Sequence, residues 1–167
     1  MRPKVTLSNS YLFECGQLYR DCERDTHLVK LNKTSKSQNQ NAQLLAEFLR
    51  DQEWISQVYY PGLEDHLGHE IAKKQMDDFG GMVSFNIIGN KLADAIKVVS
   101  STHYFTLAES LGGVESLCGH PASMTHAAIP KEEREKTGVV DSLIRLSVGI
   151  EDIEDLVADL EQDLAKI

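Results

Sequence analysis

The sequence lacks long apolar runs and has few cysteines. No stretch approaches the roughly 18 consecutive apolar residues of a membrane-spanning helix, and the start, MRPKVTLSNSYLF, lacks the apolar core of a secretory signal peptide. The three cysteines, Cys15, Cys22 and Cys118, match neither a CxxC motif nor a zinc pattern. We therefore expect a cytoplasmic protein with unpaired thiols and no membrane partner.

Clustered basic residues are also lacking. The chain of 167 residues has a net charge of -9. Residues 1–40 carry seven Lys/Arg and four Asp/Glu, whereas residues 41–167 carry ten Lys/Arg and 22 Asp/Glu. Contacts with nucleic-acid phosphates or anionic lipids need gathered Lys and Arg side chains. The acidic body argues against both partners and favours a small molecule or another protein.

Familiar catalytic motifs are absent as well. The sequence contains no phosphate loop, no dinucleotide-binding fingerprint and no nucleophile elbow. His66 and His69 would share a helix face, but a third ligand is missing and the pattern is not His-Glu-x-x-His, so we predict no metal site. Cys118, His120 and His126 are close in sequence, which alone does not establish a nucleophile and its base.

The chain changes character near residue 41. Residues 1–40 show no sustained periodicity and end in a polar stretch over residues 33–40, which predicts a poorly ordered leader. From Asn41 on, length and composition are those of one ordinary soluble domain. Apolar residues at helical spacing predict a first helix over residues 41–52.

Periodicity and turn residues then predict alternating strands and helices. The predicted strands cover residues 55–60, 82–88, 104–107, part of 114–124, and 143–148; the predicted helices cover 66–76, 91–99, 130–136 and 151–166. Several connections are too short for helical crossovers between parallel strands. We therefore predict an α+β domain with a mainly antiparallel sheet and helices on one face.

Arg145 is the residue whose position most needs an explanation. It lies in the largely apolar strand 143–148, where an unpaired guanidinium would be unfavourable to bury. Its fork of donors matches a carboxylate at two points, which suits an amino-acid ligand; an ordinary ion pair is the plain alternative. Gly112 and Gly113 permit a tight turn that brings backbone close to a ligand, or a turn without further role.

Six ordered stretches resemble one enzyme family. They are Tyr59–Leu63, His66–Ala72, Gly80–Phe85, Tyr104–Leu117, His120–Ala127 and Leu143–Glu151. Together they cover residues 41–167 and resemble the small C-terminal domain of the pyridoxal-phosphate-dependent transsulfuration enzymes of fold-type I, which include cystathionine gamma-lyase, cystathionine gamma-synthase and methionine gamma-lyase. Residues 108–112, Ala-Glu-Ser-Leu-Gly, look more like the gamma-lyase and gamma-synthase branch than the bacterial beta-lyases.

The resemblance implies roles for three residues. In the family, the arginine that matches Arg145 holds the substrate α-carboxylate, the serine that matches Ser110 lies beside the cofactor lysine, and the acid that matches Glu109 lines the side-chain end of the substrate pocket. The implied reaction is elimination or replacement at the γ-carbon of a sulfur amino acid, with pyridoxal phosphate as the electron sink. These residues do not separate lyase from synthase.

The cofactor lysine of the family has no counterpart in this sequence. Thr34-Ser35-Lys36 lacks the tyrosine that follows the lysine in the family motif. We therefore assign no catalytic residue, expect the cofactor to be bound mainly by a domain outside this sequence, and expect the chain to be inactive alone. A truncated or rearranged gene, a split enzyme and an artefactual gene model would each explain the loss of resemblance before Asn41.

A non-catalytic role is the alternative. Members of the family are usually tetramers, so by analogy the chain would form a homo-oligomer or dock on full-length family subunits as an assembly or regulatory remnant. Apolar surface left uncovered by a missing domain would favour such association.

Overall fold

The computed structural model describes the backbone from Arg24 to Ile167 and the side chains from Thr34 onward. The chain divides into two compact units, residues 1–33 and 34–167, and the fold described below is that of the second unit. Cys118 is a free thiol, as expected, whereas Cys15 and Cys22 lie outside the described residues. Within the described part of the chain, no helix is long and apolar enough to cross a bilayer.

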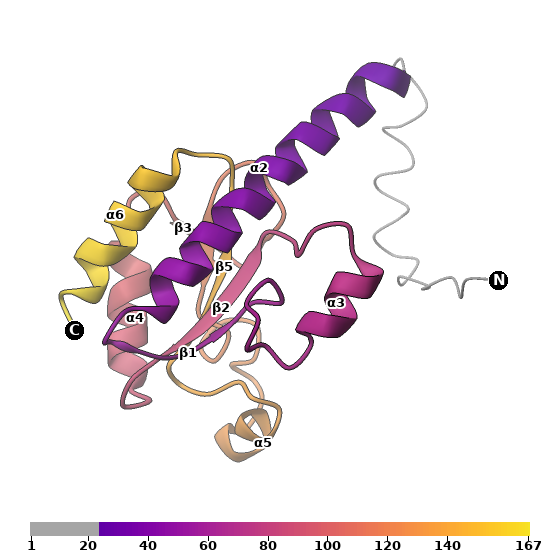
Figure 1. The fold of residues 1–167 in the computed structure, drawn as a ribbon. Helices are drawn as coiled ribbons and strands as arrows, with labels where there is room; N and C mark the ends of the chain where they lie inside the picture. The colour runs from indigo at the N-terminus through magenta and orange to yellow at the C-terminus, as the bar shows by residue number, and fades with distance from the viewer. Residues whose placement is uncertain (1–23) are drawn as a thin grey trace. The chain divides into compact units, whose positions relative to one another are not determined.

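Helices and strands follow one another along the described chain in the predicted order (Figure 1). The helices are α2 (Arg24–Arg50), α3 (His69–Gln75), α4 (Leu92–Ser101), α5 (Lys131–Lys136) and α6 (Ile153–Leu164). The strands are β1 (Ile55–Tyr59), β2 (Met82–Ile87), β3 (Thr106–Leu107), β4 (Leu117–Gly119) and β5 (Leu143–Ser147). Every element predicted from residue 55 onward is present, with ends that differ by a few residues.

The predicted start of the first helix is wrong. Residues 33–40, expected to belong to a poorly ordered leader, are part of α2, which begins at Arg24 rather than near Asn41. Gln38 Nε2 donates a hydrogen bond to the carbonyl of Gly113 at 2.6 Å, and Asn41 Nδ2 donates to two carbonyls between β5 and α6, at 2.8 and 3.2 Å. Hydrogen bonds to distant loops therefore anchor this polar part of the helix, and local periodicity does not reveal them.

The strands form one mixed sheet in the order β1-β2-β5-β4-β3. β2 pairs antiparallel with β1 and β5, and β4 pairs antiparallel with β5, but β3 and β4 run parallel. The α+β class is confirmed, whereas the mainly antiparallel sheet is wrong. That prediction rested on the lack of room for helical crossovers, and the loop of residues 108–116 makes the crossover between β3 and β4 without a helix.

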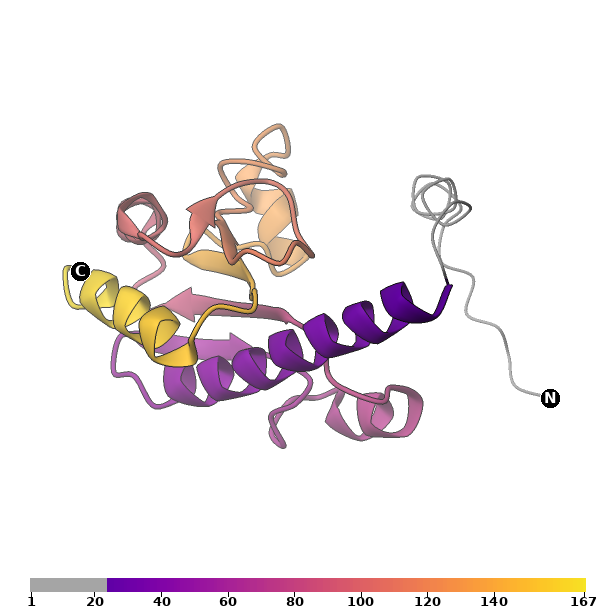
Figure 2. The same cartoon turned by 90° about the horizontal axis from the view of Figure 1, so that it is seen from above.

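One face of the sheet carries the hydrophobic core. Val83 and Phe85 of β2 are buried and pair with the buried residues Leu146 and Ile144 of β5. Apolar residues of α2, α4 and α6 belong to the same cluster, and these helices lie together in Figure 1, with α2 and α6 side by side again in Figure 2. The alternating residues of β2 and β5 face the other way, and they are the ones that carry polar side chains.

A buried carboxylate connects α6 to the segment between α4 and β3. Asp159 is 2% exposed and accepts hydrogen bonds from the backbone N–H groups of His103, Tyr104 and Phe105, at 2.8 to 3.2 Å. Phe105 itself is buried in the core cluster. Asp159 therefore fixes the turn from which β3 and the following loop emerge.

We expect Asp159→Asn to lower the free energy of unfolding by about 2 kcal/mol, because an amide offers fewer acceptors to three N–H donors at a buried site. Urea denaturation followed by circular dichroism measures this change. Glu161→Gln, at an exposed position of the same helix, is the matched control, and it should change the free energy of unfolding by less than about 0.5 kcal/mol. Equal effects of the two substitutions would contradict this role of Asp159.

Candidate functional site

Arg145 lies on the face of the sheet opposite the core. Its neighbours across the strands are Ser84 of β2 and Gly119 of β4. The flanking residues Ile144 and Leu146 are fully buried, whereas Arg145 is partly exposed. The alternation of a β-strand therefore directs the guanidinium away from the core.

The guanidinium of Arg145 contacts the loop that carries Glu109 and Ser110. Its Nη2 donates a hydrogen bond to the backbone carbonyl of Glu109 at 3.2 Å. A Cβ at Gly119 would lie 3.1 Å from the carbonyl of Ala108, so glycine at this position lets the loop approach β4 closely. The structure therefore brings Arg145 against the backbone of this loop, while the roles of the three residues in substrate binding stay a prediction.

Among the described residues, no aspartate or glutamate forms an ion pair with Arg145. The plain alternative, an ordinary ion pair, is thus not what this part of the chain shows. One hydrogen bond to a carbonyl engages only part of the fork of donors that a guanidinium carries. Glu109 and Ser110 are both exposed beside it. The arrangement can accept an anionic ligand from outside.

A narrow crevice lies beside Arg145. It is lined by the loop, β4 and the turn that follows β4: Ala108, Glu109, Gly119, His120, Pro121, Met124, Thr125 and Arg145. The crevice is too narrow to hold a water molecule. A ligand therefore does not fit inside this crevice, whereas Glu109 and Ser110 on the adjoining loop are exposed.

Cys118 and His120 do not form a nucleophile and its base. The Sγ atom of Cys118 is buried, 3.6 Å from two backbone carbonyls, and burial raises the pKa of its thiol. Both ring nitrogens of His120 are engaged, one with Ser123 Oγ and the other with the carbonyl of Asp141, each at 2.8 Å. His120 is therefore a structural histidine of the crevice wall.

His66 and His69 also have structural roles. His69 Nδ1 lies 2.8 Å from the carbonyl of Pro61, and its ring stacks on Phe79 with 5.3 Å between ring centroids. His66 Nδ1 accepts a hydrogen bond from the N–H of Gly68 at 3.0 Å. Both histidines thus stabilise the turn before α3. The described side chains contain no cluster of three or more His, Cys, Asp or Glu residues placed to hold a metal ion.

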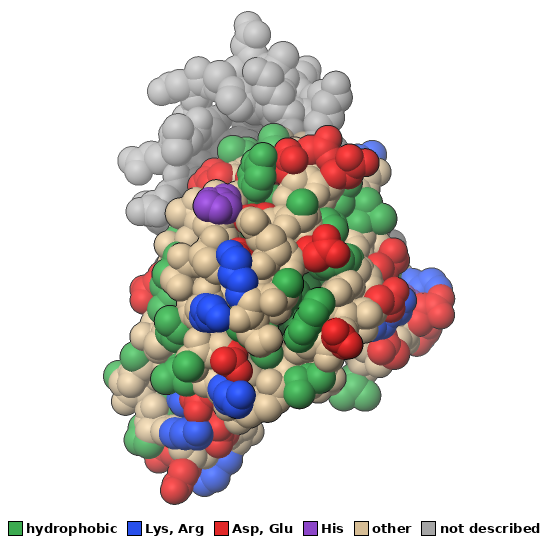
Figure 3. Space-filling view, turned by 90° about the vertical axis from the view of Figure 1, so that its left-hand side faces the viewer, with side chains coloured by type: hydrophobic (Ala, Val, Ile, Leu, Met, Phe, Trp, Pro, Cys, Tyr) green, Lys and Arg blue, Asp and Glu red, His purple; other side chains and the backbone are tan. Residues whose placement is uncertain are grey.

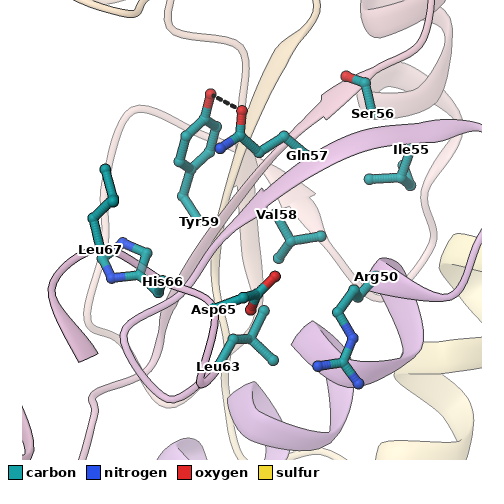
Figure 4. Close-up of a pocket in the computed structure, with 10 residues that line it drawn as sticks. All are labelled: Arg50, Ile55, Ser56, Gln57, Val58, Tyr59, Leu63, Asp65, His66 and Leu67. Atoms are coloured by element: carbon teal, nitrogen blue, oxygen red, sulfur yellow. Dashed lines mark hydrogen bonds between the residues drawn. The ribbon is translucent and has the colours of Figure 1, made fainter. Parts of the chain in front are cut away.

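A larger hollow lies beside the edge strand β1 (Figure 4). Its volume is about 360 Å³, and it is lined by Arg50, by all residues of β1 and by Leu63, Asp65, His66 and Leu67. The hydroxyl of Tyr59 donates to Gln57 Oε1 there, at 3.2 Å. None of the three predicted substrate-binding residues lines this hollow, so its size does not make it the candidate site.

Sequence reasoning missed the residues that hold the loop in place. Ser147 Oγ accepts a hydrogen bond from the N–H of Gly112 at 2.8 Å, and the carboxylate of Glu151 binds Ser116. The sequence placed Glu151 at the end of a stretch that resembles the family and at the start of the last predicted helix, without a contact to the loop. The position of Ser147 could have indicated its role, because it lies two residues after Arg145 and therefore on the same face of the strand.

The fold is a small α+β domain in which a partly exposed arginine contacts the loop of residues 108–116. Residues 29–165 match the model of the Cys/Met metabolism PLP-dependent enzymes. The chain belongs to this family. The match begins at residue 29, before the boundary near residue 41 that the sequence motifs had indicated.

Three relatives illustrate the similarity. The chain is 58% identical over 173 residues to a cystathionine beta-lyase of Lactococcus lactis subsp. cremoris, across 97% of this chain and 45% of the relative. It is 54% identical over 127 residues to an L-methionine gamma-lyase of Fusobacterium nucleatum subsp. polymorphum, across 76% and 32%. A crystal structure of cystathionine gamma synthase from Xanthomonas oryzae pv. oryzae in complex with cystathionine superposes with a TM-score of 0.76 at 47% identity, across 81% of this chain and 35% of that chain.

These relatives confirm the family and the branch with the gamma-lyases and gamma-synthases. The chain spans less than half the length of each of the three. Relatives named beta-lyase and gamma-lyase match at similar identity, 58% and 54%, so their names do not select one reaction.

The family depends on pyridoxal phosphate, and the described residues near Arg145 do not fit this cofactor by themselves. A Schiff base with the cofactor needs a lysine at the site. No lysine lines the crevice at Arg145. Lys36, in the stretch Thr34-Ser35-Lys36 that partly resembles the family's lysine motif, lies within α2. These residues therefore include a guanidinium but no covalent partner for the cofactor.

We expect the thiol of Cys118 to react at least tenfold more slowly with iodoacetamide at pH 8 in the folded chain than in urea. Its raised pKa lowers the thiolate fraction, and burial blocks access. Peptide mapping by mass spectrometry follows Cys118 separately from Cys15 and Cys22. Rapid alkylation of the folded chain at Cys118 would show that this thiol is accessible and would reopen its role as a nucleophile.

Proposed function

We propose that the chain is the substrate-binding C-terminal domain of a pyridoxal-phosphate-dependent transsulfuration enzyme. The reaction is elimination or replacement at the γ-carbon of a sulfur amino acid, of the cystathionine gamma-lyase or gamma-synthase type. The observation that carries the proposal is the partly exposed guanidinium of Arg145, which contacts the Glu109 carbonyl and has no acidic partner among the described residues.

In this proposal Arg145 binds the α-carboxylate of the substrate at two points. Two parallel N–H···O bonds orient the amino acid as well as hold it, which is the contribution that positioning makes to such a reaction. Ser110 then lies next to the cofactor lysine, and Glu109 faces the side-chain end of the substrate. Pyridoxal phosphate, when bound, supplies the electron sink.

We infer that a domain outside this sequence supplies the cofactor lysine. The loop at Arg145 is surrounded by exposed apolar side chains, which is typical of a surface that packs against protein. They are Leu107, Leu111, Val114 and Ile150, each 45 to 54% exposed. Val114 and Ile150 are adjacent, since the carbonyl of Val114 accepts a hydrogen bond from the N–H of Ile150 at 2.9 Å.

The alternative function is an assembly or regulatory module. The same apolar surface would then dock the chain on full-length family subunits, or on further copies of itself, without catalysis. Nucleic acid is not a partner in either proposal, and a cytoplasmic location stays a prediction. On the face that Figure 3 shows, acidic and basic side chains are interspersed rather than gathered into a basic surface.

Complementation separates the two functions. Mixed with pyridoxal phosphate alone, the chain should not show the absorbance band of an internal aldimine, the Schiff base between the cofactor and a lysine. Mixed with the separately expressed cofactor-lysine domain of the Lactococcus lactis relative, it should elute earlier in size-exclusion chromatography and release thiol from L-cystathionine. A complex without activity would favour the assembly module, and a Schiff-base band from the chain alone would contradict the assignment of the lysine to another domain.

In the active complex, Arg145→Lys should lower kcat/KM for L-cystathionine about 30-fold, because an ammonium group cannot reproduce the two-point contact and about 2 kcal/mol is lost. Arg50→Lys is the matched control, at an exposed residue outside the crevice. It should change kcat/KM by less than about twofold. Unchanged kcat/KM in the Arg145 variant would exclude Arg145 as the carboxylate-binding residue.

A further inference from the structure

The loop of residues 108–116 has few apolar contacts of its own, although it carries two of the predicted substrate-binding residues. Glu109 through Gly112 are exposed, and so are Val114 and Glu115. Exposed loops that bury little apolar surface open easily unless hydrogen bonds hold them. The conformation of this loop therefore depends on polar contacts with the rest of the domain.

Ser147 makes the first of these contacts. Its side chain is 3% exposed, and its Oγ accepts a hydrogen bond from the N–H of Gly112 at 2.8 Å. Gly112 has a φ of 78°, which favours glycine, so the turn after Ser110 has one defined shape. Ser147 lies two residues after Arg145 in β5, on the same face of the strand.

Glu151 makes the second contact, at the other end of the loop. Its Oε1 accepts from the N–H of Ser116 at 2.6 Å, and its Oε2 accepts from the hydroxyl of Ser116 at 2.8 Å. The hydroxyl oxygen of Ser116 accepts in turn from the N–H of Gly149 at 2.8 Å. A Cβ at Gly149 would overlap both Glu151 Oε2 and the carbonyl of Val114, so only glycine permits this close approach.

Both contacts come from the segment that also carries the guanidinium. Arg145, Ser147, Gly149 and Glu151 are alternate residues of β5 and its continuation toward α6. Because β5 is paired on both sides, by β2 and β4, it is a rigid base for Arg145 and Ser147, and Gly149 and Glu151 follow it directly. The separation between Arg145 and the Glu109–Ser110 backbone is thus set by hydrogen bonds between the loop and one continuous segment, β5 and the residues that follow it.

We propose that Ser147 and Glu151 are positioning residues, which hold the loop so that the Arg145 guanidinium and the Glu109–Ser110 backbone face one ligand. The identity of that ligand, an amino-acid carboxylate, rests on the function proposed above. The positioning of the loop by Ser147 and Glu151 is inferred only from contacts within this chain. A misplacement of about 1 Å at such a site can lower a reaction rate a hundredfold.

The test compares Ser147→Ala with the wild-type chain in the absence of any ligand. Hydrogen–deuterium exchange should be about tenfold faster at the amide of Gly112 in the variant, because its acceptor is lost. The side-chain Nε–H resonance of Arg145 in a 15N-resolved NMR spectrum should move beyond its line width, because the loop that contacts the guanidinium is released. Glu151→Gln should accelerate exchange at the amide of Ser116.

Ser147→Thr keeps the hydroxyl and should restore both signals, whereas Ser100→Ala, a matched change at an exposed position of α4, should leave both unchanged. The Ser147→Thr variant also keeps the test decisive if the alanine variant fails to fold. Wild-type signals in Ser147→Thr would support the role of the hydroxyl, and displaced signals would overturn the proposal. Unchanged Gly112 exchange, or an unchanged Arg145 signal, in folded Ser147→Ala overturns the proposal.

The outcome is independent of the proposed activity. If Arg145→Lys leaves kcat/KM unchanged while Ser147→Ala moves the Arg145 signal, the substrate role fails and the positioning role stands. If Arg145→Lys lowers kcat/KM and Ser147→Ala has no effect on the Arg145 signal, the substrate role of Arg145 stands and the positioning role of Ser147 fails.

Discussion

The Arg145 side chain constrains the whole architecture, because it projects from the sheet face opposite the hydrophobic core and that face must stay accessible. Ile144 and Leu146 are fully buried on one face of β5, and Arg145 between them emerges on the other. A charged side chain in a strand of this kind is stable only if one face of the sheet stays accessible, because burying it unpaired would be unfavourable. The packing of α2, α4 and α6 against one face satisfies this condition.

The two faces are stabilised by different forces. The core face gains its stability from apolar burial, at roughly 25 cal/mol per Å² of surface. The other face relies on directional hydrogen bonds: Ser147 and Glu151 accept from N–H groups of the loop, and Arg145 donates to the Glu109 carbonyl. Apolar packing tolerates small displacements of a loop, whereas these bonds specify its position. A binding site on the polar face therefore has defined geometry even though its loop is exposed.

Local patterns predicted the elements well, because alternation in β2 and β5 and the apolar stripe of α6 follow directly from burial. They failed where distant contacts decide. Gln38 helps to hold a polar helix by a bond to Gly113, 75 residues away, and a loop rather than a helix links the parallel strands β3 and β4. At the candidate site, the resemblance suggested Arg145, Ser110 and Glu109. It did not suggest the hydrogen bonds that Ser147 and Glu151 accept, whose donors are 35 residues earlier in the chain.

The position of the apolar side chains around the loop bears on how the proposed enzyme would work. Leu107, Leu111 and Val114 are exposed on the element that also presents Glu109 and Ser110. A protein surface that covered them would exclude water from the guanidinium of Arg145, and its attraction for a carboxylate would increase in the lower dielectric. The domain that supplies the lysine would then also strengthen substrate recognition by this chain. If docking raises the affinity for the amino acid in this way, linkage requires that the bound amino acid strengthens docking by the same factor.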